Sequence, residues 1–357
     1  MVRRVAVLLA GMLLAWAAPA RAQVDLPALN AALIDGHVAP GYARFATAAD
    51  GLDDAVGALC AAPTEAGLAA ARAAFRGAVA AWSGVQHLRL GPVEADNRYH
   101  RIDHWPDRKN AVGRHLARAV DQADQAPVDP DRFRQGSVAV QGLPALERLL
   151  YGPDHVAALM AGTGPGRCRV ATAITANLAA LGGQLAAEWA GPARRPFLHP
   201  GPGEALYRTP KEVTGDLVGA FGAGVEMIRD LKLGRVLAAD GATRPQRGEW
   251  RRAGLGLLAL RDSLKAQADL FHAGLDTALE TLDDDGALGE AIQSELAAAL
   301  RLTEDLGDDL TAVLADPDGQ RRLALLSSQL SGLKELAAGD LRGALGLGIG
   351  FNAFDGD

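Results

Sequence analysis

Residues 189–210, which read WAGPARRPFLHPGPGEALYRTP, divide the chain into two parts. Proline lacks a backbone N–H and clashes with the preceding turn of a helix, so no regular helix can run through a stretch with so many prolines. The prolines are Pro192, Pro196, Pro200, Pro202 and Pro210. Helical patterns lie on both sides of this break. The sequence therefore predicts two helical bundles, over residues 23–192 and 205–357.

The segments on both sides of the break are rich in alanine and leucine. Apolar residues make up 49% of the chain and aromatic residues only 5%, a composition that suits packed helices better than a β-sandwich. No Asn-Gly turn separates alternating runs, so the sequence predicts an all-α fold. Apolar residues recur at three- and four-residue steps in segments 42–61, 64–82, 109–125, 137–151, 166–189, 211–236, 249–279, 288–314 and 319–336.

The charge balance is that of an ordinary acidic globular protein. Lysine and arginine number 36 against 43 aspartates and glutamates, a formal charge of -7, and charged residues make up 22% of the chain. These values argue against a disordered chain. An acidic protein is also a poor partner for a phosphate backbone, so we expect no binding to nucleic acid.

The first 22 residues have the pattern of a secretory signal peptide. Arg3 and Arg4 precede an apolar stretch over residues 5–18, and Ala20-Arg21-Ala22 supplies a small-x-small cleavage site. The apolar stretch is too short to span a bilayer, and we expect no membrane span after cleavage. The sequence thus predicts a soluble protein exported to the periplasm.

Two cysteines, Cys60 and Cys168, remain in the mature chain. A small even number in an exported protein suggests one disulfide. Two buried reduced thiols are the alternative. A zinc site is not expected from two cysteines so far apart.

A polar loop that contains Arg101, Trp105 and Asp107 lies between two of the expected helices. Long loops in compact domains are usually functional or disordered, and the tryptophan and paired charges argue against disorder. We expect either a ligand-binding loop or a packed loop, anchored by Trp105, with a salt bridge between Arg101 and Asp107. His100 and His104 form the one close histidine pair of the sequence.

A second cluster reads QGLPALERLLY, from Gln141 to Tyr151. In a helix that begins near Pro144, Glu147 shares a face with that proline and has leucines on either side. A buried carboxylate needs a cation, a metal or strong hydrogen-bond donors. The alternative is a first-turn glutamate that the helix dipole favours.

Charged residues gather at two further places. Glu249-Trp250-Arg251-Arg252 is expected to open a long helix, where arginines oppose the helix dipole and so indicate carboxylate partners elsewhere. The chain ends in Asp355-Gly356-Asp357, which could contact those arginines or a hard cation. Solvated surface charges are the alternative at both places.

With these motifs in their order along the chain, the sequence resembles the imelysin family, exported helical proteins associated with bacterial iron uptake. The resemblance is carried by Pro40-Gly41-Tyr42, Trp82, Arg89-x-Gly91-Pro92, Trp105-Pro106-Asp107, Gly142-Leu143-Pro144-Ala145-Leu146-Glu147, Trp250-Arg251 and Gly350-Phe351-Asn352-x-x-Asp355-Gly356-Asp357. It implies two bundles related by a duplication, with a polar site near their junction. The ligand-binding residues implied are Arg101, Trp105, Asp107, Gly142, Pro144, Glu147, Arg251 and Asp355.

The family's hallmark is Gly-x-His-x-x-Glu, and here Gly142 and Glu147 match while Pro144 occupies the histidine position. Proline offers no ligand atom, which leaves Glu147 as the one candidate metal ligand of this motif. A catalytic zinc normally has three protein ligands, so the departure weakens a metallopeptidase activity.

Three functions follow from these residues and from the resemblance. The first is a non-catalytic periplasmic binding component of iron acquisition, which takes iron or an iron-carrying small ligand and works with an envelope uptake partner. The second is a helical envelope scaffold in which Glu147 and Arg251 form an internal ion pair. The third is a metallopeptidase that assembles a metal from Glu147 with His100, His104 or Asp107.

Overall fold

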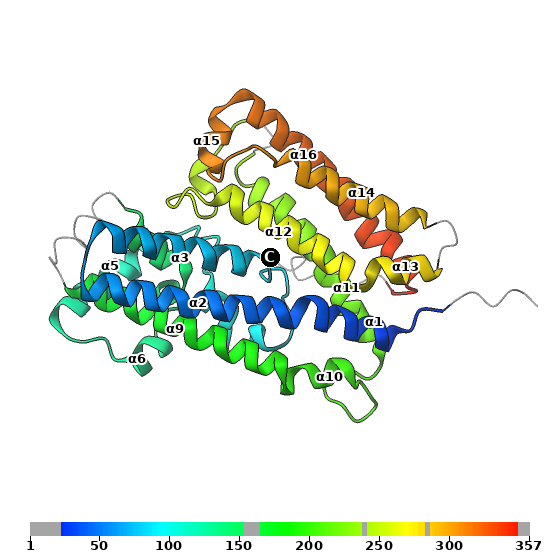
Figure 1. The fold of residues 1–357 in the computed structure, drawn as a ribbon, viewed down its shortest axis with the longest axis horizontal. Helices are drawn as coiled ribbons and strands as arrows, with labels where there is room; N and C mark the ends of the chain where they lie inside the picture. Colours follow the sequence, from blue (N-terminus) through cyan, green and yellow to red (C-terminus); the bar gives the residue numbers. More distant parts are fainter. Residues whose placement is uncertain (1–22, 153–164, 238–240, 283–285, 349–357) are drawn as a thin grey trace, which may run out of the picture.

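The computed structural model describes residues 23–152, 165–237, 241–282 and 286–348 (Figure 1). Within them the regular structure is helical, and β-structure is limited to one isolated bridge between Leu237 and Thr243. The prediction of an all-α fold is confirmed. The predicted signal peptide, over residues 1–22, and Asp355 lie outside the described residues.

The first helices of the part before the proline-rich stretch form one continuous helix, in which a π-helical turn joins two α-helices. Short helical turns fill the polar loops between the longer helices. The elements are α1 (Leu26–Leu33), η1 (Ile34–Val38), α2 (Ala39–Ala61), α3 (Glu65–Ser83), η2 (Gly91–Asn97), α4 (Arg98–Ile102), α5 (Ala111–Gln125), α6 (Pro130–Gln135), η3 (Val138–Val140), α7 (Leu143–Leu150) and α9 (Pro165–Ala190).

The proline-rich stretch itself contains only η4 (Pro192–Arg194) and α10 (Arg195–Leu198). The helices after it again include π-helical turns that continue an α-helix. They are α11 (Pro210–Glu226), η5 (Met227–Leu233), η6 (Pro245–Arg247), α12 (Gly256–Leu270), η7 (Phe271–Leu275), α13 (Asp276–Leu282), α14 (Ala287–Leu302), α15 (Leu310–Ala315), α16 (Pro317–Glu335), η8 (Leu336–Leu341) and α17 (Arg342–Ala344).

The helices form two groups that lie one above the other in Figure 1. The N-terminal group contains α2, α3, α5 and α9, and the C-terminal group contains α12, α14, α15 and α16. The exact boundaries of the two bundles, and their descent from a duplication, stay predictions.

Helix α9 is the central helix of the N-terminal group. It packs along α2 and α5, and the disulfide between Cys60 and Cys168 ties α2 to α9, as predicted. By length and hydropathy α9 could cross a membrane, a property that the sequence analysis missed, but half of its 18-residue apolar window is buried in the protein. The core helix of a globular protein meets the same criteria.

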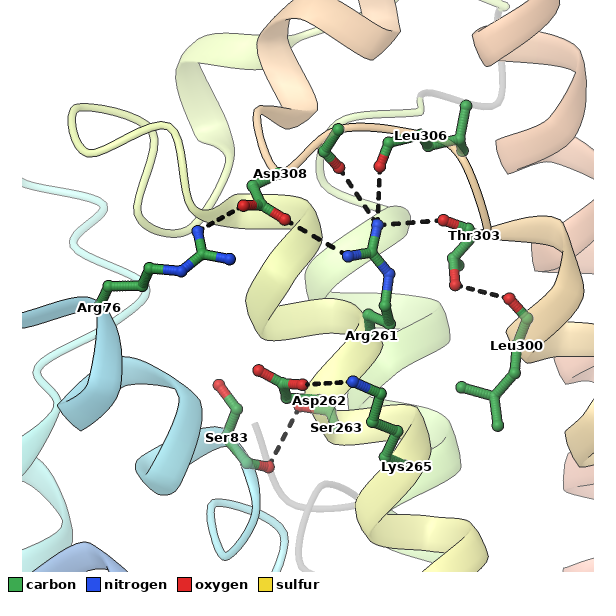
Figure 2. Close-up of polar contacts among 11 residues, drawn as sticks. Arg76, Ser83, Arg261, Asp262, Ser263, Lys265, Leu300, Thr303, Leu306 and Asp308 are labelled. Atoms are coloured by element: carbon green, nitrogen blue, oxygen red, sulfur yellow. Dashed lines mark hydrogen bonds and ion pairs between the residues drawn. The ribbon is translucent and has the colours of Figure 1, made fainter. Parts of the chain in front are cut away.

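The two groups are joined by polar contacts as well as apolar packing. Asp308, in the loop before α15, pairs with Arg76 of α3 and with Arg261 of α12 (Figure 2). Arg261 also donates to the backbone carbonyls of Thr303 and Leu306, at 3.0 and 2.7 Å, which fixes the 303–308 loop. This loop interrupts the helix expected over 288–314, because its carbonyls are turned toward Arg261 and not along a helix axis.

Candidate functional site

The start of α7 requires glycine at position 142. A Cβ atom there would lie 2.2 Å from the carbonyl oxygen of Ile102 and 2.6 Å from that of Arg101. Only glycine therefore allows α7 to begin directly against the end of α4. The helix expected over 137–151 is interrupted for this reason, with η3 before Gly142 and α7 after it. Pro144 occupies the first turn of α7, where a missing N–H costs nothing.

Glu147 of α7 is buried, with only 4% of its surface exposed. Its Oε1 accepts hydrogen bonds from the backbone N–H groups of Arg252 and Ala253, at 2.9 and 3.1 Å, and the Arg252 guanidinium lies 3.8 Å from Oε2. Burial raises the pKa of Glu147, while these donors and the charge of Arg252 oppose the rise. The residue that the scaffold hypothesis pairs with Glu147 is Arg251, but the guanidinium in contact belongs to Arg252.

The sequence analysis expected a long helix to begin at Glu249. In the structure, the segment from Glu249 to Leu255 is not helical. Trp250 has a φ of 50° and Gly254 a φ of 66°, values that no right-handed helix contains. The N–H groups of residues 252 and 253 are turned toward Glu147, so α12 begins only at Gly256. One carboxylate on α7 thus shapes a loop of the C-terminal group.

Asp107 and Trp105 lie in the loop before α5. The two carboxylate oxygens of Asp107 accept hydrogen bonds from the N–H groups of Ala111 and Val112, at 2.7 and 3.0 Å. Asp107 therefore caps the N-terminus of α5, a favourable place for a negative charge. The Arg235 guanidinium lies 5.7 Å from the centre of the Trp105 ring, within range of a cation–π interaction.

Arg101 points away from Asp107, so the salt bridge considered for this pair is not formed. Its guanidinium donates to Gln141 Oε1 at 2.7 Å and to Asn177 Oδ1 at 2.9 Å. Asn177 is on α9, and Arg101 is on the last turn of α4, one residue before Ile102. Arg101 therefore fixes α4 against α9 and does not line the cavity described next.

A cavity of about 860 Å³ lies where the two groups of helices meet. We call it the junction pocket. It is lined by residues of the 104–110 loop, by Val112, by Pro144, Glu147 and Arg148 of α7, by Arg235, and by residues 246–252. Of the predicted site residues, the structure brings Trp105, Asp107, Pro144, Glu147 and Arg251 together here. Gly142 supports α7 behind the pocket, and Asp355 lies outside the described residues.

A buried polar network behind the junction pocket escaped the sequence analysis. Lys232 forms an ion pair with Glu249 and donates to Gln86 Oε1 at 2.8 Å. The Gln86 amide donates to Glu249 at 2.9 Å and to Asp103 at 2.8 Å, and the Trp82 indole donates to Asp103 at 3.0 Å. Burial, and next the charge of Glu249, raise the pKa of Asp103 well above its ordinary value. No local sequence signal could have joined these residues, which come from four separate segments.

The most frequent side chain in the junction pocket is also one that the sequence analysis largely missed. Six arginines line it, and the sequence analysis singled out only Arg251, as a ligand-binding residue, and Arg252, as an arginine with a carboxylate partner elsewhere. The six are Arg108, Arg148, Arg235, Arg247, Arg251 and Arg252. Two of them precede the proline-rich break and four follow it, so their convergence depends on the fold.

The family model for imelysin, peptidase family M75, matches residues 38–337. The chain belongs to the imelysin family. No protein of curated function matches it. Two solved structures resemble this imelysin: an imelysin-like protein from Psychrobacter arcticum 273-4 and a candidate iron-regulated protein A precursor from Parabacteroides distasonis ATCC 8503.

Both likenesses are likenesses of fold. The Psychrobacter protein is 18% identical with a TM-score of 0.77, and the match covers 93% of this chain and 100% of that one. The Parabacteroides protein is 14% identical with a TM-score of 0.68, and the match covers 90% of this chain and 97% of that one.

In this imelysin the residues around Glu147 do not fit a bare metal cation. Among the described residues, no group of three or more histidine, cysteine, aspartate or glutamate side chains is placed to hold a metal ion. Oε1 of Glu147 already accepts two N–H groups, and Arg148, Arg251 and Arg252 line the same pocket. A cation brought to Glu147 would meet these guanidinium charges at close range.

Proposed function

We propose that this imelysin is a non-catalytic binding component of iron acquisition in the periplasm, and that an iron species binds in the junction pocket. The proposal is supported by membership of the imelysin family, by the sequence pattern of a signal peptide, and by the name of the Parabacteroides neighbour. The observation that carries it is the junction pocket itself.

The junction pocket has the size and chemistry of a small-ligand site. Its volume of about 860 Å³ falls within the roughly 300–1,000 Å³ usual for such sites. Trp105 and Trp250 offer aromatic surface, and several guanidinium groups converge on the space. A ligand here would contact residues on both sides of the proline-rich break, so both groups of helices would contribute to its binding.

The same geometry supports binding over catalysis. The three carboxylates that line the pocket each have fixed partners: Asp107 accepts the N–H groups at the start of α5, Glu147 accepts those of residues 252 and 253, and Glu249 pairs with Lys232. A general base must be able to reach its substrate or a water molecule, and none of these three carboxylates is free to do so. The metallopeptidase hypothesis would first have to free Glu147 from its two hydrogen bonds, whichever of His100, His104 or Asp107 joined it.

The scaffold hypothesis draws on the contacts that join the two groups, such as the pairing of Asp308 with Arg76 and Arg261 (Figure 2). These contacts lie outside the junction pocket. A scaffold has no need for a large cavity in which guanidinium groups outnumber carboxylates, and we therefore prefer a binding protein.

Equilibrium dialysis of the chain from Gln23 against ferrous iron, ferric iron and ferric citrate tests the proposal. We expect the protein to retain close to one equivalent of at least one form. Glu147→Ala should lower the affinity for that form at least tenfold, because residues 250–252 lose their anchor, while Glu147→Gln, which keeps an acceptor oxygen, should lower it less. Glu204→Ala is the matched control, because Glu204 lies on an exposed loop, where it pairs with Arg195. Retention of none of the three forms would refute the proposal.

A further inference from the structure

We infer that the junction pocket binds a multiply charged oxyanion, a small molecule with two or more carboxylate or phosphate groups. Iron would then arrive as the chelate of such an anion and not as a bare cation. The inference rests on the proposed function only in placing the ligand in the junction pocket.

The first argument is the charge balance of the lining. Six arginines stand against three carboxylates, and those carboxylates are already compensated. Glu249 pairs with the buried Lys232, which is outside the lining. Asp107 and Glu147 each accept two backbone N–H groups. They also lie 3.8 Å from the guanidinium groups of Arg148 and Arg252, respectively, which leaves four arginines without a carboxylate contact among the described residues. The guanidinium charges therefore exceed what the described part of the protein neutralises.

The second argument is that three arginines crowd together around Glu147. Burial lowers the pKa of Arg252, and the charges of Arg148 and Arg251 lower it further. Burial also lowers the pKa of Arg148; the charges of Asp107 and Glu147 oppose this change, and the charge of Arg251 adds to it. Like charges at close range repel one another, so an anion placed among them would be held firmly.

A second group of three arginines is centred on Arg235, whose guanidinium lies 5.7 Å from the centre of the Trp105 ring. Burial lowers the pKa of Arg235, and the charges of Arg108 and Arg247 add to the effect. The Nε atom of Arg235 is buried without an acceptor among the described residues. A buried N–H left unpaired destabilises the protein, and a ligand oxygen would supply the missing acceptor.

These two groups of arginines determine the kind of ligand. A guanidinium presents a planar fork of donors that matches carboxylate and phosphate oxygens. Because both groups line one cavity, a ligand with a single anionic group could satisfy only one of them. A compact polyanion, with the Trp105 ring against its apolar part, satisfies both. A bare ferrous or ferric ion satisfies neither.

Isothermal titration calorimetry at constant ionic strength tests this inference with citrate, pyrophosphate and acetate, all free of iron. We expect citrate or pyrophosphate to bind at least 100-fold more tightly than acetate. Whichever of the two binds more tightly identifies the carboxylate or the phosphate class. Arg251→Ala and Arg247→Ala, one from each group, should each weaken the polyanion at least tenfold, and Arg251→Lys should recover part of the loss. Arg321→Ala, an exposed arginine that pairs with Asp318, should leave the affinity unchanged.

The outcomes of the two experiments separate the two proposals. Tight binding of an iron-free polyanion, with no retention of ferric citrate or of either iron ion, would keep the inference and refute the iron function. Retention of ferrous or ferric iron without any affinity for polyanions would keep the iron function and overturn the inference. Equal affinities for citrate, pyrophosphate and acetate, or arginine variants that bind as the wild type does, would also overturn the inference.

Discussion

At the scale of single residues, the most unusual group is the buried carboxyl of Asp103. It shares the Gln86 amide with Glu249, and its Oδ1 has no hydrogen-bond partner among the described residues. Lys232 compensates Glu249 directly, so one positive charge faces two carboxylates in the interior. Two negative charges that share one amide group in the protein interior are costly, and a proton on Asp103 removes one of them.

We therefore predict that Asp103→Asn stabilises the protein at neutral and alkaline pH. The raised pKa means that the folded wild type binds a proton that the unfolded chain releases. Wild-type stability thus falls as pH rises from about 4 toward the raised pKa, by up to about 1.4 kcal/mol per pH unit. Asparagine needs no proton and can still accept from Trp82 and Gln86. Urea denaturation of both proteins at pH 5 and pH 8 measures the effect, and a stability difference that is the same at both values would contradict it.

The sequence predicted part of this site, and the limits have a physical cause. Leucines around Glu147 indicated its burial, and Trp105, Asp107 and Arg251 were chosen because the resemblance to the imelysin family implied them. Sequence spacing gives no information on residues brought together from distant segments. Lys232 and four of the six pocket arginines escaped prediction for that reason, and Arg101 was assigned to a site that it does not line.

At the scale of elements, α2 and α9 form the closest helix pair of the N-terminal group. A Cβ on Gly182 of α9 would lie 3.0 Å from Cα of Ala46 on α2, so the two backbones nearly touch. The disulfide joins the same helices across a sequence separation of 108 residues. Because packing already holds these helices together when the protein is folded, the cross-link acts mainly on the unfolded chain.

We predict that the double variant Cys60→Ser/Cys168→Ser unfolds more easily but keeps its ligand affinity. A loop of this length should contribute about 2–4 kcal/mol to the free energy of unfolding, while the junction pocket contains no residue of α2 or α9. Urea denaturation with and without a reductant gives the first quantity, and calorimetry with the polyanion gives the second. A variant with the wild-type midpoint would show that the cross-link contributes no stability.

Element positions were predicted well where the apolar periodicity extends over many residues. They were predicted poorly where a side chain distant in the sequence changes the backbone conformation. The sequence located α2, α3, α5, α9 and α16 to within a few residues. It missed the loop over 249–255, which depends on Glu147 far away in the chain. It also missed the π-helical turns, among them η1, which contacts α12 and η7 of the other group.

At the scale of the whole molecule, the junction between the groups buries a second titratable pair, His37 of η1 and His87 after α3. Their Nε2 atoms lie 3.3 Å apart, and both Nδ1 atoms lack a partner among the described residues. Burial lowers the pKa of His37 to about 4, with Arg44 contributing, and burial lowers that of His87 well below its ordinary value, with His37 contributing. The free energy of unfolding therefore depends on pH in opposite directions through the histidines and through Asp103.

The histidine pair should make the protein less stable in mild acid. A folded pKa of about 4 against about 6.5 in the unfolded chain means that the unfolded state binds the proton first as pH falls. The contribution of His37 is fully present above pH 6.5 and is lost between pH 6.5 and 4, with a change of about 3 kcal/mol.

Because the Asp103 contribution grows over part of the same range, the wild-type curve alone cannot separate them. The difference between Asp103→Asn and the triple variant Asp103→Asn/His37→Gln/His87→Gln isolates the histidines. Urea denaturation at pH 7, 5.5 and 4.5 should show this difference shrink or reverse on acidification, and a difference independent of pH would contradict the assignment.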